Sequence, residues 1–255
     1  TETNDLLLDY DYFNANDYLC EDKFGIGMSY RVELRIHKKT EELNVHKTIP
    51  NYDEYLSKDE IINYSRELNI IIKLNHPSVL KFIGYSQRYE TYYLPRVVVE
   101  YAPNGTLFKL LEQKSENDYW NDTKKLINIY GIAHAMKYLH EHNIIHRDLK
   151  TENIVLDESL NPKLTGFNIS KFLTDDETIS KSKKIKGTPA YIAPEIYSGG
   201  EYSKMSDVYS FGLVMYEIVT GLKPFEKCRS PKEIKEIIVN QSKRPIIEDI
   251  INPAY

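Results

Sequence analysis

The sequence predicts an α+β fold of two lobes, a small β-rich lobe followed by a larger helical one, with a cleft between them. Up to Tyr101 the chain consists mainly of short runs rich in β-branched and aromatic residues, which are separated by turn residues. A turn-rich break follows at Ala102-Pro103-Asn104-Gly105, and beyond it the apolar residues recur at helical spacing. A chain of 255 residues, 41% hydrophobic and 28% charged, is long enough to bury such a core.

In the small lobe we expect an antiparallel meander, a helix and two further strands. The helix ends before His76-Pro77, because proline disfavours helix for the residue before it. Apolar residues recur along the helix at helical spacing, namely Ile61, Ile62, Leu68, Ile71 and Ile72. The expected elements are strands Leu19–Gly27, Tyr30–His37 and Leu43–Ile49, helix Asp59–Leu74, and strands Val79–Gln87 and Tyr92–Tyr101.

In the large lobe we expect two long helices and a hairpin. Tyr209–Thr220 is almost wholly apolar but too short for a membrane helix, so it predicts a buried central helix. Asn153–Leu156 and Pro162–Thr165 flank polar turn residues and predict a hairpin. Asp122–His142 predicts a half-buried helix, with a stripe of Leu126, Ile129, Ile132, Met136 and Leu139.

Composition and charge exclude several classes of function. Cys20 and Cys228 lie far apart without partner spacing, which indicates a reducing compartment and argues against a zinc site. A net charge of −5 argues against a nucleic-acid-binding surface. Because the apolar stretches are too short to span a bilayer and the acidic start is no signal peptide, we expect a cytoplasmic protein without a membrane span.

The segment from His146 to Asn153, which reads His-Arg-Asp-Leu-Lys-Thr-Glu-Asn, carries the strongest chemical signal. It matches the H-R-D-L-x-x-x-N catalytic loop. From about Tyr18 onward the chain resembles a eukaryotic-type protein kinase. The resemblance implies that Asp148 accepts the proton of the substrate hydroxyl and that Asn153 holds a metal ion. Lys150 resembles the Ser/Thr-specific version of the loop.

Further matches follow in the family's order. Val45-His46-Lys47 resembles V-A-I-K, whose lysine pairs the nucleotide phosphates and a glutamate placed like Glu67. Gly187–Glu195 resembles the A-P-E segment of Ser/Thr kinases, and Ser206–Gly212 resembles the tyrosine-kinase-like group, where Asp207 holds the catalytic-loop backbone. The implied nucleotide-binding residues are Gly25, Gly27, Val32, Val45, Lys47, Glu67, Val99, Glu100, Ala102 and Val155.

The same resemblance divides the chain into four parts. We expect an N-terminal extension (1–17), an N-lobe (18–98), a hinge (99–104) and a C-lobe (105–255). Domains of the family usually continue for some tens of residues past a segment like the present end. We therefore expect the final helices to be missing and Glu195 of A-P-E to lack its usual arginine partner.

Three positions depart from the family pattern. Gly166-Phe167-Asn168 stands where the family has D-F-G, so the carboxylate that binds Mg²⁺ is missing. The triplet resembles that of mixed-lineage kinase domain-like pseudokinases. Tyr30 replaces the third glycine of the phosphate loop, and Val45 replaces an alanine beneath the adenine. Together these changes predict weak, Mg²⁺-independent ATP binding at most and impaired Mg²⁺ binding.

Other features suit a module that holds one shape. Ile71, Phe82, His146 and Phe167 match the apolar column that joins the helix of the small lobe to the catalytic loop in kinases. The polar stretch Leu173–Lys186 predicts a regulatory loop, with a plain solvated loop as the alternative. Its candidate phosphorylation sites are Thr174, Thr178, Ser180 and Ser182.

The sequence therefore predicts a pseudokinase that acts as a signalling scaffold or switch and whose partners are signalling proteins. The main alternative is an active Ser/Thr kinase with reduced metal ligation, because Asp148, Lys47 and Asn153 are all present. A more distant alternative is a nucleotide sensor. The oligomeric state stays open.

Overall fold

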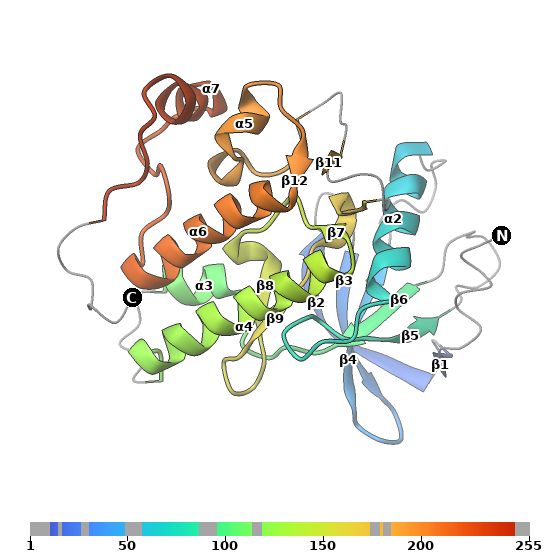
Figure 1. The fold of residues 1–255 in the computed structure, drawn as a ribbon. Coiled ribbons are helices and arrows are strands. Elements are labelled where there is room, and N and C mark those ends of the chain that lie inside the picture. The colour runs from blue at the N-terminus through green and yellow to red at the C-terminus, as the bar shows by residue number, and fades with distance from the viewer. Residues whose placement is uncertain are drawn as a thin grey trace. The chain divides into compact units, whose positions relative to one another are not determined.

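A computed structural model gives the structure of the chain (Figure 1). It describes residues 11–14, 17–26, 31–48, 58–86, 96–113, 119–173, 179–180 and 185–247. The chain divides into two compact units, Thr1–Ala102 and Pro103–Tyr255. The first unit is built on a β-sheet and the second is mainly helical, which confirms the predicted α+β class.

In the described part of the first unit, six strands form one sheet in the order β1-β5-β6-β4-β3-β2. Strands β2, β3 and β4 pair antiparallel in succession, which confirms the predicted meander. β1 pairs parallel with β5, so residues of the expected N-terminal extension form an edge of the sheet. The strands are β1 Asp11–Tyr12, β2 Tyr18–Ile26, β3 Arg31–His37, β4 Leu43–Thr48, β5 Phe82–Ser86 and β6 Arg96–Glu100.

The pleat of β4 distributes its residues between the two faces of the sheet. Val45 and Lys47 share one face, and Val45 stands opposite Val99 of β6. Both valines are buried, as β-branched side chains on a covered strand should be. Asn44 and His46 share the other face.

Helix α2 (Lys58–Ile71) begins near the expected residue and ends three residues early. Its buried stripe runs through Tyr64, Leu68 and Ile71, which are four and three residues apart. The prediction that Ile62 belongs to the stripe is wrong. Ile62 is 51% exposed because it falls off this spacing.

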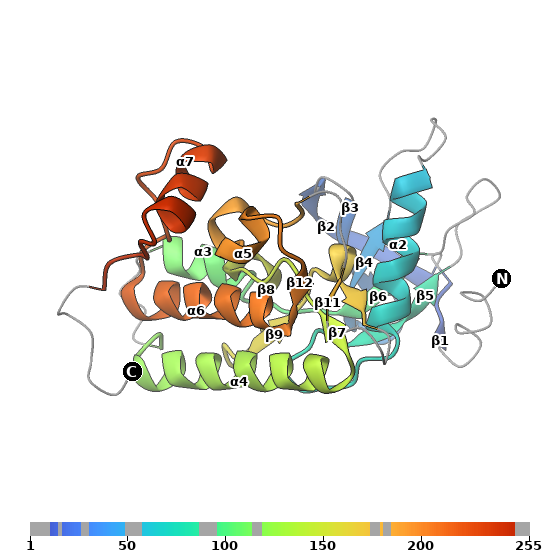
Figure 2. The ribbon, with the colours of Figure 1, turned by 45° about the horizontal axis from the view of Figure 1, so that its top comes forward.

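Helices α4 (Asp122–Glu141) and α6 (Lys204–Thr220) lie side by side in the second unit, as both views show (Figure 1, Figure 2). Between α4 and α6 in the sequence, β8 and β9 pair antiparallel, which confirms the predicted hairpin. The remaining elements are α3 Leu107–Glu112, β7 Ile144–Ile145, β8 Ile154–Leu156, β9 Pro162–Leu164, β10 Lys171–Phe172, β11 Ile179–Ser180, α5 Pro194–Tyr197, β12 Tyr202–Ser203 and α7 Pro231–Lys235.

The predicted stripe of α4 is confirmed at Ile132, Met136 and Leu139, which are buried, but not at its N-terminal end. Leu126 is 40% exposed, whereas Asn128 is fully buried. The Asn128 Nδ2 donates to the carbonyls of Lys124 and Leu160, each at 2.9 Å, which satisfies the NH₂ group of this buried amide. The stripe is therefore wrong at Leu126, where a hydrogen-bonded asparagine two residues further on is buried instead.

Helix α6 begins five residues before the predicted start. Ser203 and Ser206 form a capping box at its N-terminus. The hydroxyl of Ser206 accepts the N–H of Ser203 at 3.1 Å, and the hydroxyl of Ser203 accepts the N–H of Met205 at 3.2 Å. Gly221 ends the helix with a left-handed φ of 68°. The polar residues before Tyr209 therefore belong to the helix, and among them Asp207 is buried.

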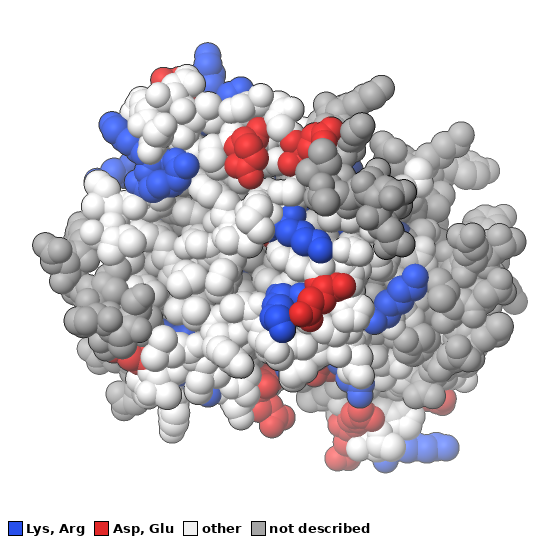
Figure 3. Space-filling model, viewed as in Figure 1, with Lys and Arg blue, Asp and Glu red and all other residues white. Residues whose placement is uncertain are grey.

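On the face that Figure 3 shows, the described basic and acidic side chains are interspersed. Most of the predicted regulatory loop lies outside the described residues, as do Gly27 and Tyr30.

Candidate active site

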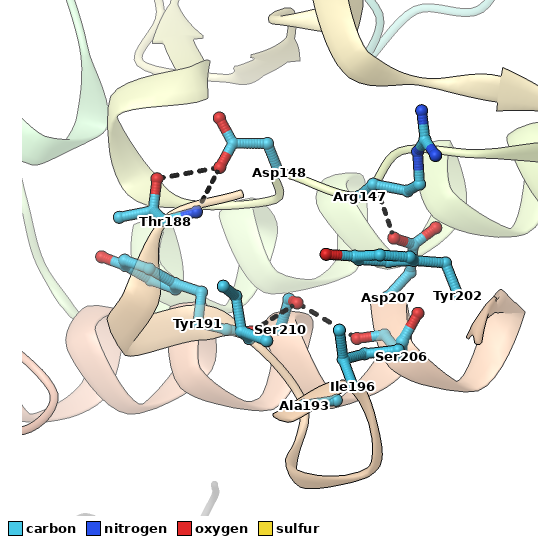
Figure 4. A pocket seen from close by; sticks show the side chains of 11 residues that line it. Arg147, Asp148, Thr188, Tyr191, Ala193, Ile196, Tyr202, Ser206, Asp207 and Ser210 are labelled. Carbon is cyan, nitrogen blue, oxygen red and sulfur yellow. Dashed lines mark hydrogen bonds between the residues drawn. The ribbon is translucent and has the colours of Figure 1, made fainter. Parts of the chain in front are cut away.

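The segment His146–Asn153 runs between β7 and β8 and is held by a carboxylate of α6. Asp207, 1% exposed, accepts the backbone N–H groups of His146 and Arg147, each at 2.8 Å. Figure 4 shows its bond to Arg147, whose φ is +68°. His140 of α4 adds a third contact, 3.0 Å from Asp207 Oδ2. A buried carboxylate with three donors fixes a loop that contains a strained residue.

Asp148 projects from this loop, and both of its carboxylate oxygens accept hydrogen bonds. The N–H and hydroxyl of Thr188 donate to Oδ1 at 2.9 and 2.8 Å (Figure 4). Asn153 Nδ2 donates to Oδ2 at 3.1 Å. Lys150 Nζ donates to Thr188 Oγ1 at 2.8 Å and lies 3.8 Å from Asp148 Oδ2. The carboxylate is therefore oriented by its neighbours and able to accept a proton from a hydroxyl at this place.

His146 supports the loop from below as a neutral ring. Its Nε2 donates to the carbonyl of Thr165 at 2.9 Å, and its Nδ1 accepts the N–H of Asp148 at 3.3 Å. Complete burial lowers the pKa of His146, which agrees with one donor and one acceptor nitrogen. The ring centroid of Phe167 lies 5.2 Å away. Of the predicted apolar column, His146 and Phe167 thus meet in the second unit, and Ile71 and Phe82 are buried in the first.

A cavity beside Asp148 is too small for a substrate. Its volume is about 10 Å³, which is room for one water molecule. Figure 4 shows its walls, which include Arg147, Thr188, Tyr202 and Ser210.

A second buried carboxylate, Glu217 of α6, joins this loop to the segment that contains Tyr191. The hydroxyl of Tyr191 donates to its Oε1 at 2.5 Å, and Thr151 donates to its Oε2 at 3.2 Å. Burial raises the pKa of Glu217 to about 7, against the opposing effect of these two donors. The sequence analysis did not single out Thr188, Tyr191 or Glu217 as site residues. For Glu217 the sequence did offer a signal, because it is a single carboxylate within the apolar part of α6.

In the first unit, β4 and α2 bring Lys47 and Glu67 together. Lys47 Nζ lies 3.6 Å from Glu67 Oε1, and their side chains are 15% and 9% exposed. The expected partner of this lysine is therefore in place. Val32 of β3 stands opposite Lys47 and Gly25.

One family profile covers nearly the whole chain. The family described as protein kinase domain matches residues 18–253. The chain belongs to the protein kinase domain family.

Relatives of this kinase domain include three proteins of Arabidopsis thaliana. Cysteine-rich receptor-like protein kinase 8 is 33% identical over 223 residues, 86% of this chain and 32% of the relative. Probable L-type lectin-domain containing receptor kinase S.5 is 40% identical over 164 residues, 62% and 24% respectively. Wall-associated receptor kinase-like 5 is 35% identical over 178 residues, 69% and 24%. The chain spans about a quarter to a third of these relatives' length.

None of the described helices of the kinase domain has the length and apolar character required to cross a membrane.

The Mg²⁺ ion implied by the family does not fit the residues present. Gly166 has no carboxylate, and a Cβ built there would lie 2.5 Å from Asn153 Cγ and 2.6 Å from its Oδ1. Asn153 is turned toward Asp148, donating to its carbonyl at 2.7 Å and to its Oδ2. Within the described residues no three His, Cys, Asp or Glu side chains gather as metal ligands would. Hard cations require oxygen ligands, and Gly166 supplies none, while both oxygens of the neighbouring Asp148 carboxylate already accept hydrogen bonds.

The predicted site residues fall into two groups. The second unit brings together Asp148, Lys150 and Asn153, while Val155 of β8 bridges Thr106 nearby. The first unit holds the remaining described residues, which are Gly25, Val32, Val45, Lys47, Glu67, Val99, Glu100 and Ala102. Gly27 lies outside the described residues. Their roles in binding stay predictions.

The predicted hinge and A-P-E residues have the following surroundings. Glu100 exchanges two bonds with Lys81: its N–H donates to the Lys81 carbonyl at 3.0 Å, and its Oε1 accepts the Lys81 N–H at 2.7 Å. Glu195 is exposed in α5.

Proposed function

We propose that this kinase domain is a pseudokinase of the tyrosine-kinase-like group, resembling the mixed-lineage kinase domain-like proteins. The observation that carries the proposal is the pairing of Gly166 with Asn153. The position that would supply a carboxylate has no side chain, and the carboxamide of Asn153 fills the space where one would begin. The one remaining ligand of the family pair is thus neutral and bonded to Asp148.

Phosphotransfer requires stabilisation of charge on the transferred group, and metal ions supply most of it in this family. The residues that this chain retains perform other tasks. Asp148 can accept a hydroxyl proton, and Lys47, steadied by Glu67, can meet an anionic group. Proton acceptance and one cation do not replace the missing stabilisation. Chemistry should therefore be slow even when substrates bind.

The retained contacts favour a role as a signalling scaffold or switch that binds other signalling proteins. Asp207, His146 and Glu217 each fix a segment around the loop, so its shape is preserved without its metal ligand. We place this domain in the cytoplasm.

A nucleotide titration tests this proposal. We expect ATP to raise the Tm of the domain, because Lys47 is retained and can bind phosphate. The increase should be small, because Val45 is larger than the usual alanine and narrows the expected adenine site. The shift should be equal in Mg²⁺ and in EDTA. Lys47→Ala should abolish it, and Lys38→Ala, an exposed lysine of the same unit, should leave it unchanged. A shift that occurs only with Mg²⁺ would overturn the proposal.

An active Ser/Thr kinase with reduced metal ligation is the second candidate. The contacts among Asp148, Lys150 and Thr188 and the Lys47–Glu67 ion pair favour it, since an unused active site needs neither. Phosphotransfer that depends on Asp148 would decide for this candidate.

A further inference from the structure

The outer face of the sheet, opposite to Val45 and Lys47, carries polar side chains that are buried. Asn44 is 1% exposed and His46 is 0% exposed, and both lie on β4. Glu33 stands opposite His46 and Arg35 stands opposite Asn44 on β3. Glu33 and Arg35 form an ion pair at 2.7 Å. None of these four residues takes part in the function proposed above.

Asn44 and His46 are buried, and the described residues offer no hydrogen-bond partner to either polar atom of the Asn44 amide or to either ring nitrogen of His46. Buried polar groups in folded proteins are almost always hydrogen-bonded, so four such atoms on two alternate positions of one strand are exceptional. Leaving them dry destabilises the covered state relative to a hydrated one.

One aromatic ring lies against His46, and a second ring packs on the first. The ring of Tyr18 is 5.0 Å from the ring of His46 and 5.0 Å from that of His37. Phe13 packs on Tyr18 at 5.8 Å. We call Phe13 and Tyr18 the ring cover. Phe13 is attached to the sheet by its N–H, which donates to the Tyr85 carbonyl at 2.8 Å, next to the two-residue strand β1.

The ring cover has both favourable and unfavourable interactions. The ring cover gains from aromatic contact and apolar burial. It loses by excluding water from Asn44 and His46. The His46 ring is neutral, because burial first, and then the charges of Arg35 and Arg96, lower its pKa to about 3. Its uncharged nitrogens are therefore available to water whenever the rings move away.

We propose that the ring cover is a displaceable lid and that its opening hydrates Asn44 and His46 and loosens strand β4. Since the same strand presents Lys47 on its other face, the lid regulates the strand that carries this lysine. The proposal goes beyond the pseudokinase assignment and holds for an active kinase equally.

Reaction of histidines with diethyl pyrocarbonate, followed by mass spectrometry of the native domain, tests the lid. His146 is a matched control: it is also 0% exposed and its pKa is also lowered by burial, but both of its nitrogens are hydrogen-bonded. We expect His46 to react at least tenfold faster than His146. Equal protection of the two rings would overturn the proposal, because it would leave only global unfolding as the route to His46.

Two variants extend the test to the strand. Tyr18→Ala should speed the reaction of His46 and the hydrogen exchange of Leu43–Thr48 at least several-fold, without speeding the reaction of His146. Asn44→Val with His46→Val should slow that exchange and raise the Tm, since apolar side chains remove the reason to open. Cys20→Val, at an exposed strand position, controls for adding valine to the sheet. Unchanged hydrogen exchange in both test variants would contradict the coupling to β4. If Tyr18→Ala does not fold, the comparison of His46 with His146 in the wild type still tests the lid.

Discussion

Gly166 has a left-handed backbone, with φ at 85° and ψ at 39°, and its Cα faces the side chain of Asn153. Residues other than glycine adopt this conformation at a cost of about 1–2 kcal/mol. A side chain at this position must also displace the Asn153 carboxamide from Asp148. The glycine is therefore part of how the loop packs, in addition to being a missing ligand.

Gly166→Ala tests that packing without adding a charge. We expect the variant to lose about 1–3 kcal/mol of unfolding free energy in urea, from backbone strain and the clash with Asn153. Gly199→Ala is a matched control, because Gly199 also has a positive φ, 87°, but open space around its Cβ. If Gly166→Ala loses no more stability than Gly199→Ala, the Asn153 contact does not restrict this position.

Glu217 predicts a pH dependence of stability. Burial raises its pKa from 4.5 to about 7, so the fold favours the protonated form. The stability that the protonated Glu217 carboxyl adds to the fold is complete below pH 4.5 and is lost as the pH rises through about 7. Over that window the wild type should lose roughly 3 kcal/mol relative to Glu217→Gln. Urea unfolding at a series of pH values measures it, with exposed Glu141→Gln as a control. Parallel profiles for wild type and Glu217→Gln would contradict the assignment.

Single residues also mark where sequence reasoning fails. The motif identified Asp148 and Asn153, because residue type and spacing carry that information. It did not reveal Thr188 and Asn153 as the donors to Asp148, since these contacts depend on how η4 (Pro189–Tyr191) and η2 (Thr151–Asn153) fold back. Leu126 and Ile62 were wrongly expected on buried helix faces, because hydrophobicity alone does not report that a hydrogen-bonded amide such as that of Asn128 is buried or which way a helix face turns.

At the scale of elements, α6 organises the second unit from its N-terminal turn. Asp207 lies in that turn, next to the capping box, and holds His146 and Arg147 through their backbones. Helix and loop are thus linked by a carboxylate that is nearly inaccessible to water. Loss of its charge should affect the loop more than the helix.

Asp207→Asn should lower the unfolding free energy by about 2–4 kcal/mol. Each carboxylate oxygen of Asp207 accepts one of the two backbone N–H groups. In the asparagine variant one of these oxygens is replaced by an NH₂ group, so one buried N–H donor loses its acceptor. Lys137→Ala is the control, because it removes an exposed ion pair with Glu141 at 3.2 Å and should cost less than about 0.5 kcal/mol. A loss for Asp207→Asn as small as that of the control would contradict the role assigned to Asp207.

Elements were predicted best where the local signal is long. The meander, the α2 and α4 helices and the β8–β9 hairpin follow from periodicity and turn residues. The short helices α3, α5 and α7 and strand β1 were not predicted, since segments of two to six residues carry too little periodicity. The start of α6 was missed because polar residues of its first turn face a buried loop.

For the whole molecule, the two compact units carry different parts of the kinase machinery. The first holds the Lys47–Glu67 pair and the polar face beneath the ring cover. The second holds the catalytic loop and its supports. Each unit retains the contacts that fix its own fold, and the departure from the family that bears most on activity is the missing carboxylate at Gly166. This separation explains why sequence and structure agree on the family while the activity needs a direct test.

Phosphotransfer to a Ser/Thr protein substrate, with ATP and saturating Mg²⁺, tests the central claim most directly. Without the metal-binding carboxylate, several kcal/mol of transition-state stabilisation are lost, and each ~1.4 kcal/mol is a tenfold change in rate. We predict a rate at background that is the same for wild type and Asp148→Asn. Turnover within tenfold of an ordinary kinase, abolished by Asp148→Asn, would contradict the pseudokinase assignment.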